Sequence, residues 1–171
     1  SDHLLKVNYS EKSLNIEGSG KILLQEKYDV INYSINKNDK SYKFQTSLEV
    51  NKNPFKIDTL NFEKNESSKI MIEINGEHFL NKKTMLNQIY LTEKDNKIHV
   101  NNLLLDNNFK IESLKSINFD YFDKKDKKNK FNIIKKNNDY FINGPSFNAD
   151  NVLENIVNDS ENKLNIFTKN F

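Results

Sequence analysis

Apolar and polar side chains alternate along most of the chain. Between Tyr42 and Val50, every even position carries Tyr, Phe, Thr, Leu or Val, and every odd position carries Lys, Gln, Ser or Glu. Successive side chains of a β-strand point to opposite faces of its sheet, so this segment predicts a strand with one apolar and one polar face. Similar alternation elsewhere predicts strands at 14–25, 28–36, 41–50, 55–62, 69–75, 84–92, 97–105, 109–122, 130–136 and 139–143.

Polar clusters rich in Asn, Asp and Lys separate these segments. Asn and Asp tolerate turn conformations, so the series predicts successive hairpins and an antiparallel meander. No long helical pattern interrupts the strands, which argues against a parallel sheet with crossover helices.

The apolar positions change parity inside 55–62, which predicts a β-bulge or bend. The segment Gly18-Ser19-Gly20 predicts a turn or bulge, and Asn75-Gly76 predicts a turn.

One short helix is predicted near the C-terminal end, at 149–158. Asn148 or Asp150 would cap it, and an apolar stripe with helical spacing follows. The fold class is therefore mainly β: a long antiparallel meander that forms a twisted, curled, groove-like sheet. We expect a single β domain over 1–171. The chain begins at Ser1 without Met or a leader, so we expect this domain to be a slice of a larger β-structure.

Composition excludes several classes of function. The 171 residues carry a net charge of +2, and all 26 basic residues are lysine. A nucleic-acid-binding protein needs a strongly basic face and commonly uses arginine to contact phosphates and bases. We therefore do not expect this chain to bind nucleic acid. The absence of Cys excludes disulfides and thiol chemistry. No window is apolar enough for a membrane-spanning helix. The abundance of Asn, Lys and Ile is typical of an AT-rich genome.

The side chains that often carry chemistry form no motif. His3, His78 and His99 are far apart in sequence, so we expect no metal site. Three aspartates at 120, 123 and 126 do not match a calcium-binding loop. We therefore expect neither an enzyme nor a bound cofactor. The lysine-rich run at 124–130 has two interpretations, a solvated hairpin loop or a contact with anionic lipid head groups.

Five segments carry a resemblance to a known family: IEGSGKI at 16–22, VINYSI at 30–35, IDTLNFEK at 57–64, IEING at 72–76 and YFINGPSFNADNVL at 140–153. They resemble the AsmA-like family of Gram-negative envelope proteins, in particular the central region of its YhdP-type members. In the last segment, Gly144 to Leu153 matches a family pattern of Gly, then Phe-Asp, then a helix, with Asn148 in place of the usual Asp.

The resemblance implies a periplasmic protein that is anchored to the inner membrane by a helix outside this segment. Such a protein would convey phospholipid between the inner and outer membranes through an apolar β-groove and support outer-membrane integrity. Its partners would be phospholipid and the two membranes. The residues expected to line the groove and bind lipid are Phe44, Leu48, Ile70, Ile72, Ile74, Ile98, Val100, Ile111, Ile117 and Phe119. The alternative is a β-sandwich adhesin or surface-layer module, in which the same residues form an ordinary core.

Overall fold

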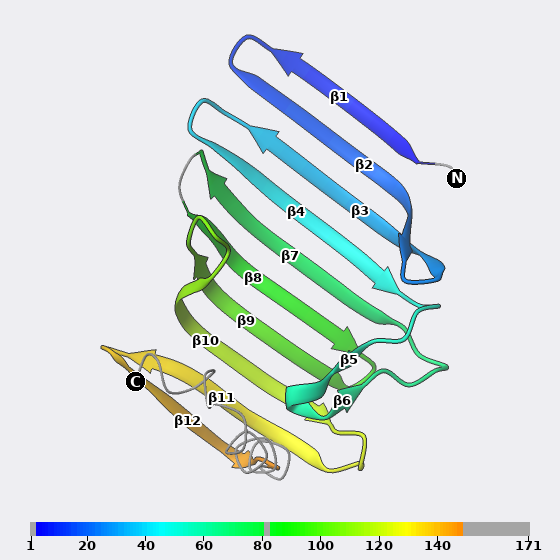
Figure 1. Cartoon of the computed structure of the whole chain (residues 1–171), viewed down its shortest axis with the longest axis vertical. Coiled ribbons are helices and arrows are strands. Elements are labelled where there is room, and N and C mark those ends of the chain that lie inside the picture. Colours follow the sequence, from blue (N-terminus) through cyan, green and yellow to red (C-terminus); the bar gives the residue numbers. More distant parts are fainter. Residues whose placement is uncertain (1–2, 81–82, 149–171) are drawn as a thin grey trace.

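The computed structural model describes residues 3–80 and 83–148 (Figure 1). The helix predicted at 149–158 lies outside the described residues. The described residues form one ten-stranded sheet and a small two-stranded one, with a single 3₁₀ turn as their only helical element. The prediction of a mainly β fold is confirmed.

All ten strands of the main sheet pair with their neighbours in antiparallel fashion. The order in the sheet follows the order in the chain, so the predicted meander is also confirmed. Its strands are β1 (Leu4–Ser10), β2 (Ser13–Leu24), β3 (Lys27–Lys37), β4 (Ser41–Val50), β7 (Ile70–Phe79), β8 (Thr84–Glu93), β9 (Asn96–Leu105), β10 (Ile111–Phe122), β11 (Lys128–Lys136) and β12 (Asp139–Ser146).

Four of the hairpins turn through only two residues. In three of them the first turn residue, Gln25, Lys94 or Asn137, has a positive φ angle, of 50°, 51° and 58° respectively. Positive φ in such a turn matches the right-handed twist of the flanking strands. Asn accepts this conformation more readily than most residues, which is why polar clusters mark the turns of this sequence.

The segment at 55–62 differs from the prediction. It forms two short strands, β5 (Lys56–Ile57) and β6 (Phe62–Glu63), joined by the 3₁₀ turn η1 (Asp58–Leu60). Asn61 follows this turn with φ of 50°, so the parity change in the sequence marks a sharp bend. The strands β5 and β6 pair with each other and leave the main sheet. We name the segment 55–63 the flap.

Two other expectations were wrong. Gly18-Ser19-Gly20 lies inside β2: all three residues pair with β3, and Gly18 and Ser19 also pair with β1. The Tyr33 ring occupies the space that a Cβ on Gly18 would need. Glycine at this position therefore leaves room for the Tyr33 ring and does not form a turn. Asn75-Gly76 lies inside β7, which continues to Phe79. The strand β1 was not predicted, and all seven of its residues are exposed.

The flap packs on one face of the sheet and closes the hydrophobic core. Phe62 is 1% exposed and meets the Tyr121 ring edge to face, with 5.9 Å between the ring centroids. The Tyr121 hydroxyl donates a hydrogen bond of 3.0 Å to the carbonyl oxygen of Leu60. The buried cluster consists of Val50, Phe62, Ile70, Leu91, Ile98, Phe119, Tyr121 and Phe131. The core therefore lies at one end of the strands.

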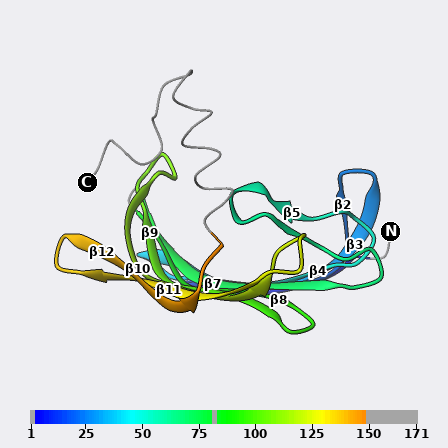
Figure 2. The same ribbon diagram turned by 90° about the horizontal axis from the view of Figure 1, so that it is seen from below.

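The sheet is bent as well as twisted. Figure 2 shows the ends of β9 and β10 and the β2–β3 hairpin rising toward the side on which β5 lies. β-bulges help to bend the strands, because an extra residue on one strand locally kinks it. The pairing register shifts between Asn75 and Gly76 in the β7–β8 pair, and between Ile111 and Ser113 in the β9–β10 pair.

Candidate functional site

Rows of apolar side chains cross the sheet from strand to strand. Directly opposite residues of an antiparallel pair share a face, so the register defines each row. Phe44 lies opposite Gly76, and its Cζ atom would be 2.8 Å from a Cβ at that position. Leu48 lies on the same face as Phe44 and packs against the core. The face that carries the flap is therefore the apolar one, and we name it the apolar face.

Three such rows succeed one another along the strands. The row beneath the flap is Gly20, Ile31, Leu48, Ile72, Leu91, Ile98, Phe119 and Phe131. The central row is Leu5, Gly18, Tyr33, Thr46, Ile74, Ile89, Val100, Ile117, Ile133 and Ile142. The outer row is Val7, Ile16, Ile35, Phe44, Gly76, Leu86, Leu103 and Leu114.

All ten residues expected to bind lipid lie on the apolar face, but in different surroundings. Ile70, Ile98 and Phe119 are buried in the core cluster. Leu48, Ile72 and Ile117 are partly buried and pack against that cluster. Phe44, Ile74 and Val100 are half-buried and lie farther from the flap. Ile111 lies at the far strand end and is 68% exposed.

The sequence interpretation missed part of this face. Leu86 and Leu103 lie in the outer row because the register shifts within β8 and because Asn102 adopts a φ of 48° inside β9. Strict alternation would assign them to the opposite face. The repeated Asn101-Asn102 before three leucines is a sequence signal for such an irregularity, since Asn favours positive φ.

The opposite face is polar. One of its rows is Ser19, Asn32, Ser47, Glu73, Tyr90, His99, Asn118, Asn132 and Asn143. A shallow hollow of about 850 Å³ lies over this face and is lined by Asn32, Ser47, Glu73 and Gln88 among others. Tyr90 and His99 stack with 3.9 Å between ring centroids, and burial lowers the pKa of His99.

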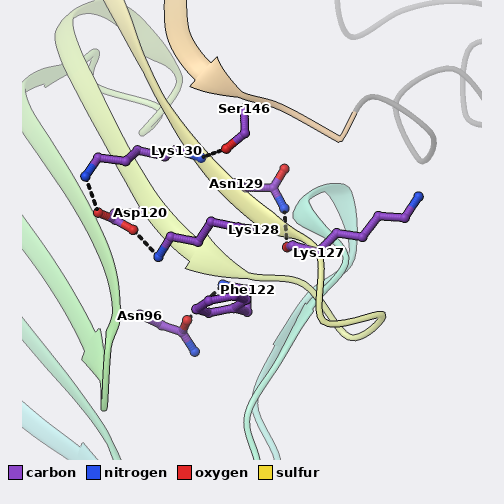
Figure 3. Close-up of polar contacts among 8 residues, drawn as sticks. All are labelled: Asn96, Asp120, Phe122, Lys127, Lys128, Asn129, Lys130 and Ser146. Atoms are coloured by element: carbon purple, nitrogen blue, oxygen red, sulfur yellow. Dashed lines mark hydrogen bonds and ion pairs between the residues drawn. The ribbon is translucent and has the colours of Figure 1, made fainter.

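The lysine run at 124–130 is partly engaged with acidic groups. Figure 3 shows Asp120 between Lys128 and Lys130, and Lys130 Nζ lies 3.2 Å from its carboxylate. The side-chain contact with Lys128 is the main cause that lowers the pKa of Asp120. Lys124 and Lys125 are exposed. The arrangement fits a solvated hairpin loop, and contact with lipid head groups stays a prediction.

Asp123 stabilises the turn before this run. It is 4% exposed, and its Oδ1 accepts hydrogen bonds from the backbone N–H groups of Lys125 and Lys127 at 2.8 and 3.0 Å. Burial alone would raise its pKa, but these bonds and one from Asn148 lower it overall. The Asp123 carboxylate therefore stabilises the loop through these hydrogen bonds. Within the described ranges, no group of three His, Asp or Glu side chains is placed to hold a metal ion.

Comparisons with known proteins give no relative. No family model matches the chain, and neither the curated proteins nor the solved structures contain a significant match. No helix in the described part of the chain has the length and apolar character needed to cross a bilayer.

Proposed function

We propose that the apolar face binds the acyl chains of phospholipid, as a segment of a periplasmic envelope protein similar to the AsmA-like family. In this proposal a helix outside the segment anchors the protein to the inner membrane. The protein conveys phospholipid between the inner and outer membranes. The observation that supports the proposal is the pair of apolar rows, central and outer, that cross the sheet beside the flap and whose side chains are half-buried or exposed.

The size of the apolar surface suits an elongated apolar ligand. Neighbouring strands lie about 4.8 Å apart, so nine intervals carry the central row over roughly 43 Å and seven carry the outer row over roughly 34 Å. Each CH₂ group removed from water contributes about 0.8 kcal/mol. An acyl chain along these rows would therefore be held by many weak contacts. Such contacts have no fixed direction, and a curled sheet would let the chain slide along its concave side.

The alternative of a β-sandwich has less support. In the part of the chain that the structure describes, only the flap lies outside the ten-stranded sheet. A sandwich needs a second sheet over the whole apolar face. The flap covers one end of the strands and leaves Phe44, Ile74 and Val100 half-buried, a pattern that favours a bound ligand over a closed core.

The proposal is tested by measuring lipid bound to purified protein with native mass spectrometry, after incubation with phosphatidylglycerol vesicles. We expect wild-type protein to retain lipid and Ile74→Asp to lose it, because a carboxylate in the central row repels an acyl chain. Asn75→Asp is the matched control, since it adds the same charge to the polar face of the same strand. It should retain lipid like the wild type.

Folding is checked on the same samples by circular dichroism. Ile70→Asp should unfold the protein, because Ile70 is 0% exposed and an unpaired buried charge is costly. Ile74→Asp should stay folded, since Ile74 is only half-buried. A folded wild-type protein that binds no lipid would overturn the proposal. Equal lipid retention by folded Ile74→Asp and Asn75→Asp would do the same.

A further inference from the structure

A group of hydrogen-bond donors lies on the apolar face just beyond the outer row. Lys37, Tyr42, His78 and Thr84 are directly opposite one another on four neighbouring strands, β3, β4, β7 and β8. Tyr42 is two residues from Phe44 along β4, so it shares the face of Phe44 and lies about 7 Å farther along the strand. We name these four residues the rim cluster.

Side-chain contacts hold the rim cluster together. The Lys37 ammonium lies 5.7 Å from the centre of the Tyr42 ring, and the Tyr42 and His78 rings are 6.5 Å apart. His78 Nδ1 and Thr84 Oγ1 form a hydrogen bond of 2.8 Å. When the Thr84 hydroxyl donates this bond, the imidazole carries its proton on Nε2. That N–H has no partner among the described residues and can donate to a ligand.

The charge of the rim cluster is positive. Among the described residues, Lys37 forms no ion pair with Asp or Glu. The nearest acid in sequence to His78 is Glu77, which lies on the opposite face and accepts a hydrogen bond from Ser41. The cluster therefore presents an ammonium, a phenol hydroxyl and an imidazole without a neutralising carboxylate in the same row.

We propose that the rim cluster binds the phosphodiester of a phospholipid whose acyl chains lie along the central and outer rows. This inference rests on the proposed function. The order of chemistry along the strands matches that of a phospholipid: apolar rows come first, and anion-binding donors follow at the strand ends. Lysine binds phosphate as a point charge, and hydroxyl and imidazole donors add short hydrogen bonds to its oxygens.

The test compares two lipids with the same acyl chains, phosphatidylglycerol and diacylglycerol, which lacks the phosphodiester. Each lipid displaces a fluorescent fatty acid from the protein, and the two midpoints give the preference for the phosphodiester. Lys37→Gln removes the charge but keeps most of the side chain. We expect it to reduce the preference about three- to tenfold and to leave diacylglycerol binding unchanged.

Lys43→Gln is the matched control. Lys43 is exposed on the polar face of β4, near the same strand ends, so the same charge change should not alter the preference. Equal preference in wild type, Lys37→Gln and Lys43→Gln would overturn the rim-cluster proposal while acyl binding stands. Failure of both lipids to displace the probe from the wild type would refute the proposed function, and the head-group site with it.

A further titration distinguishes a lipid head group from free phosphate. Inorganic phosphate is added to the wild type, and its binding is followed by the NMR signals of His78 and Tyr42. We expect binding much weaker than that of phosphatidylglycerol, because the apolar rows contribute nothing to a free ion. Binding of inorganic phosphate as tight as that of phosphatidylglycerol would contradict the assignment to a lipid.

Discussion

The flap is the element whose removal should most reduce the free energy of unfolding. Phe62 is the flap residue that holds it in place, because its side chain is buried in the core. The Phe62 ring is 1% exposed and contacts Tyr121 edge to face. Changing a buried Phe to Ala costs about 3–5 kcal/mol, through lost burial and the cavity left behind. The Tyr121 hydroxyl donates a hydrogen bond to the Leu60 carbonyl oxygen, and this bond restrains the Tyr121 ring from moving into the cavity. We therefore expect a loss of stability in the upper part of this range.

The measurement is urea unfolding of wild type and Phe62→Ala, followed by circular dichroism. Phe109→Ala is the matched control, since Phe109 is 69% exposed in the β9–β10 turn and should change stability by less than about 0.5 kcal/mol. Loss of the flap should also expose more of the apolar row beneath it and raise the binding of a hydrophobic dye. A loss below about 1 kcal/mol for Phe62→Ala would refute the view that the flap closes the core.

Two further predictions concern stability. Asp29 is 2% exposed, and its pKa lies below its ordinary value of 3.8: burial would raise it, but hydrogen bonds from Lys52, Asn53 and Asn51 outweigh that effect. Its contribution is therefore present above pH 3.8 and is lost as the pH falls through the lower folded value. Asp29→Asn should destabilise the protein at pH 7, with a difference from wild type that shrinks below about pH 4 in urea unfolding series. A constant difference would show that the charge is not involved. Gly76→Ala should cost about 1–3 kcal/mol in the same assay, because its Cβ would be 2.5 Å from the carbonyl oxygen of Met85. Unchanged stability would mean that β8 can move aside.

The alternating pattern predicted most of the sheet because strand faces depend on local sequence. Nine of the ten predicted segments, all except 55–62, belong to the main sheet. The prediction that 55–62 belongs to the main sheet was wrong. The pattern from Phe55 to Phe62 specifies apolar contacts, but it does not specify which element provides them. Here the contacts come from Tyr121, which lies on β10, far away in sequence. Strand β1 was missed because its edge position leaves both faces exposed and requires no burial pattern.

The candidate surface was predictable in part for the same reason. Period-two alternation placed all ten expected residues on the apolar face. It could not tell which of them the flap buries, so it treated Ile70 and Phe44 alike. It also missed the rim cluster, because Lys37, Tyr42 and His78 meet only through the register of three strands.

The most direct test of acyl-chain binding is photo-crosslinking with a phosphatidylglycerol that carries a diazirine in one acyl chain. Peptide mapping then identifies the residues that react. Adducts should concentrate on the apolar face outside the flap, at Phe44, Ile74, Leu86, Val100 and Leu103. Adducts that fall mainly on the polar face, around Asn32 and Tyr90, or none at all on the folded protein, would contradict the proposed role of the sheet.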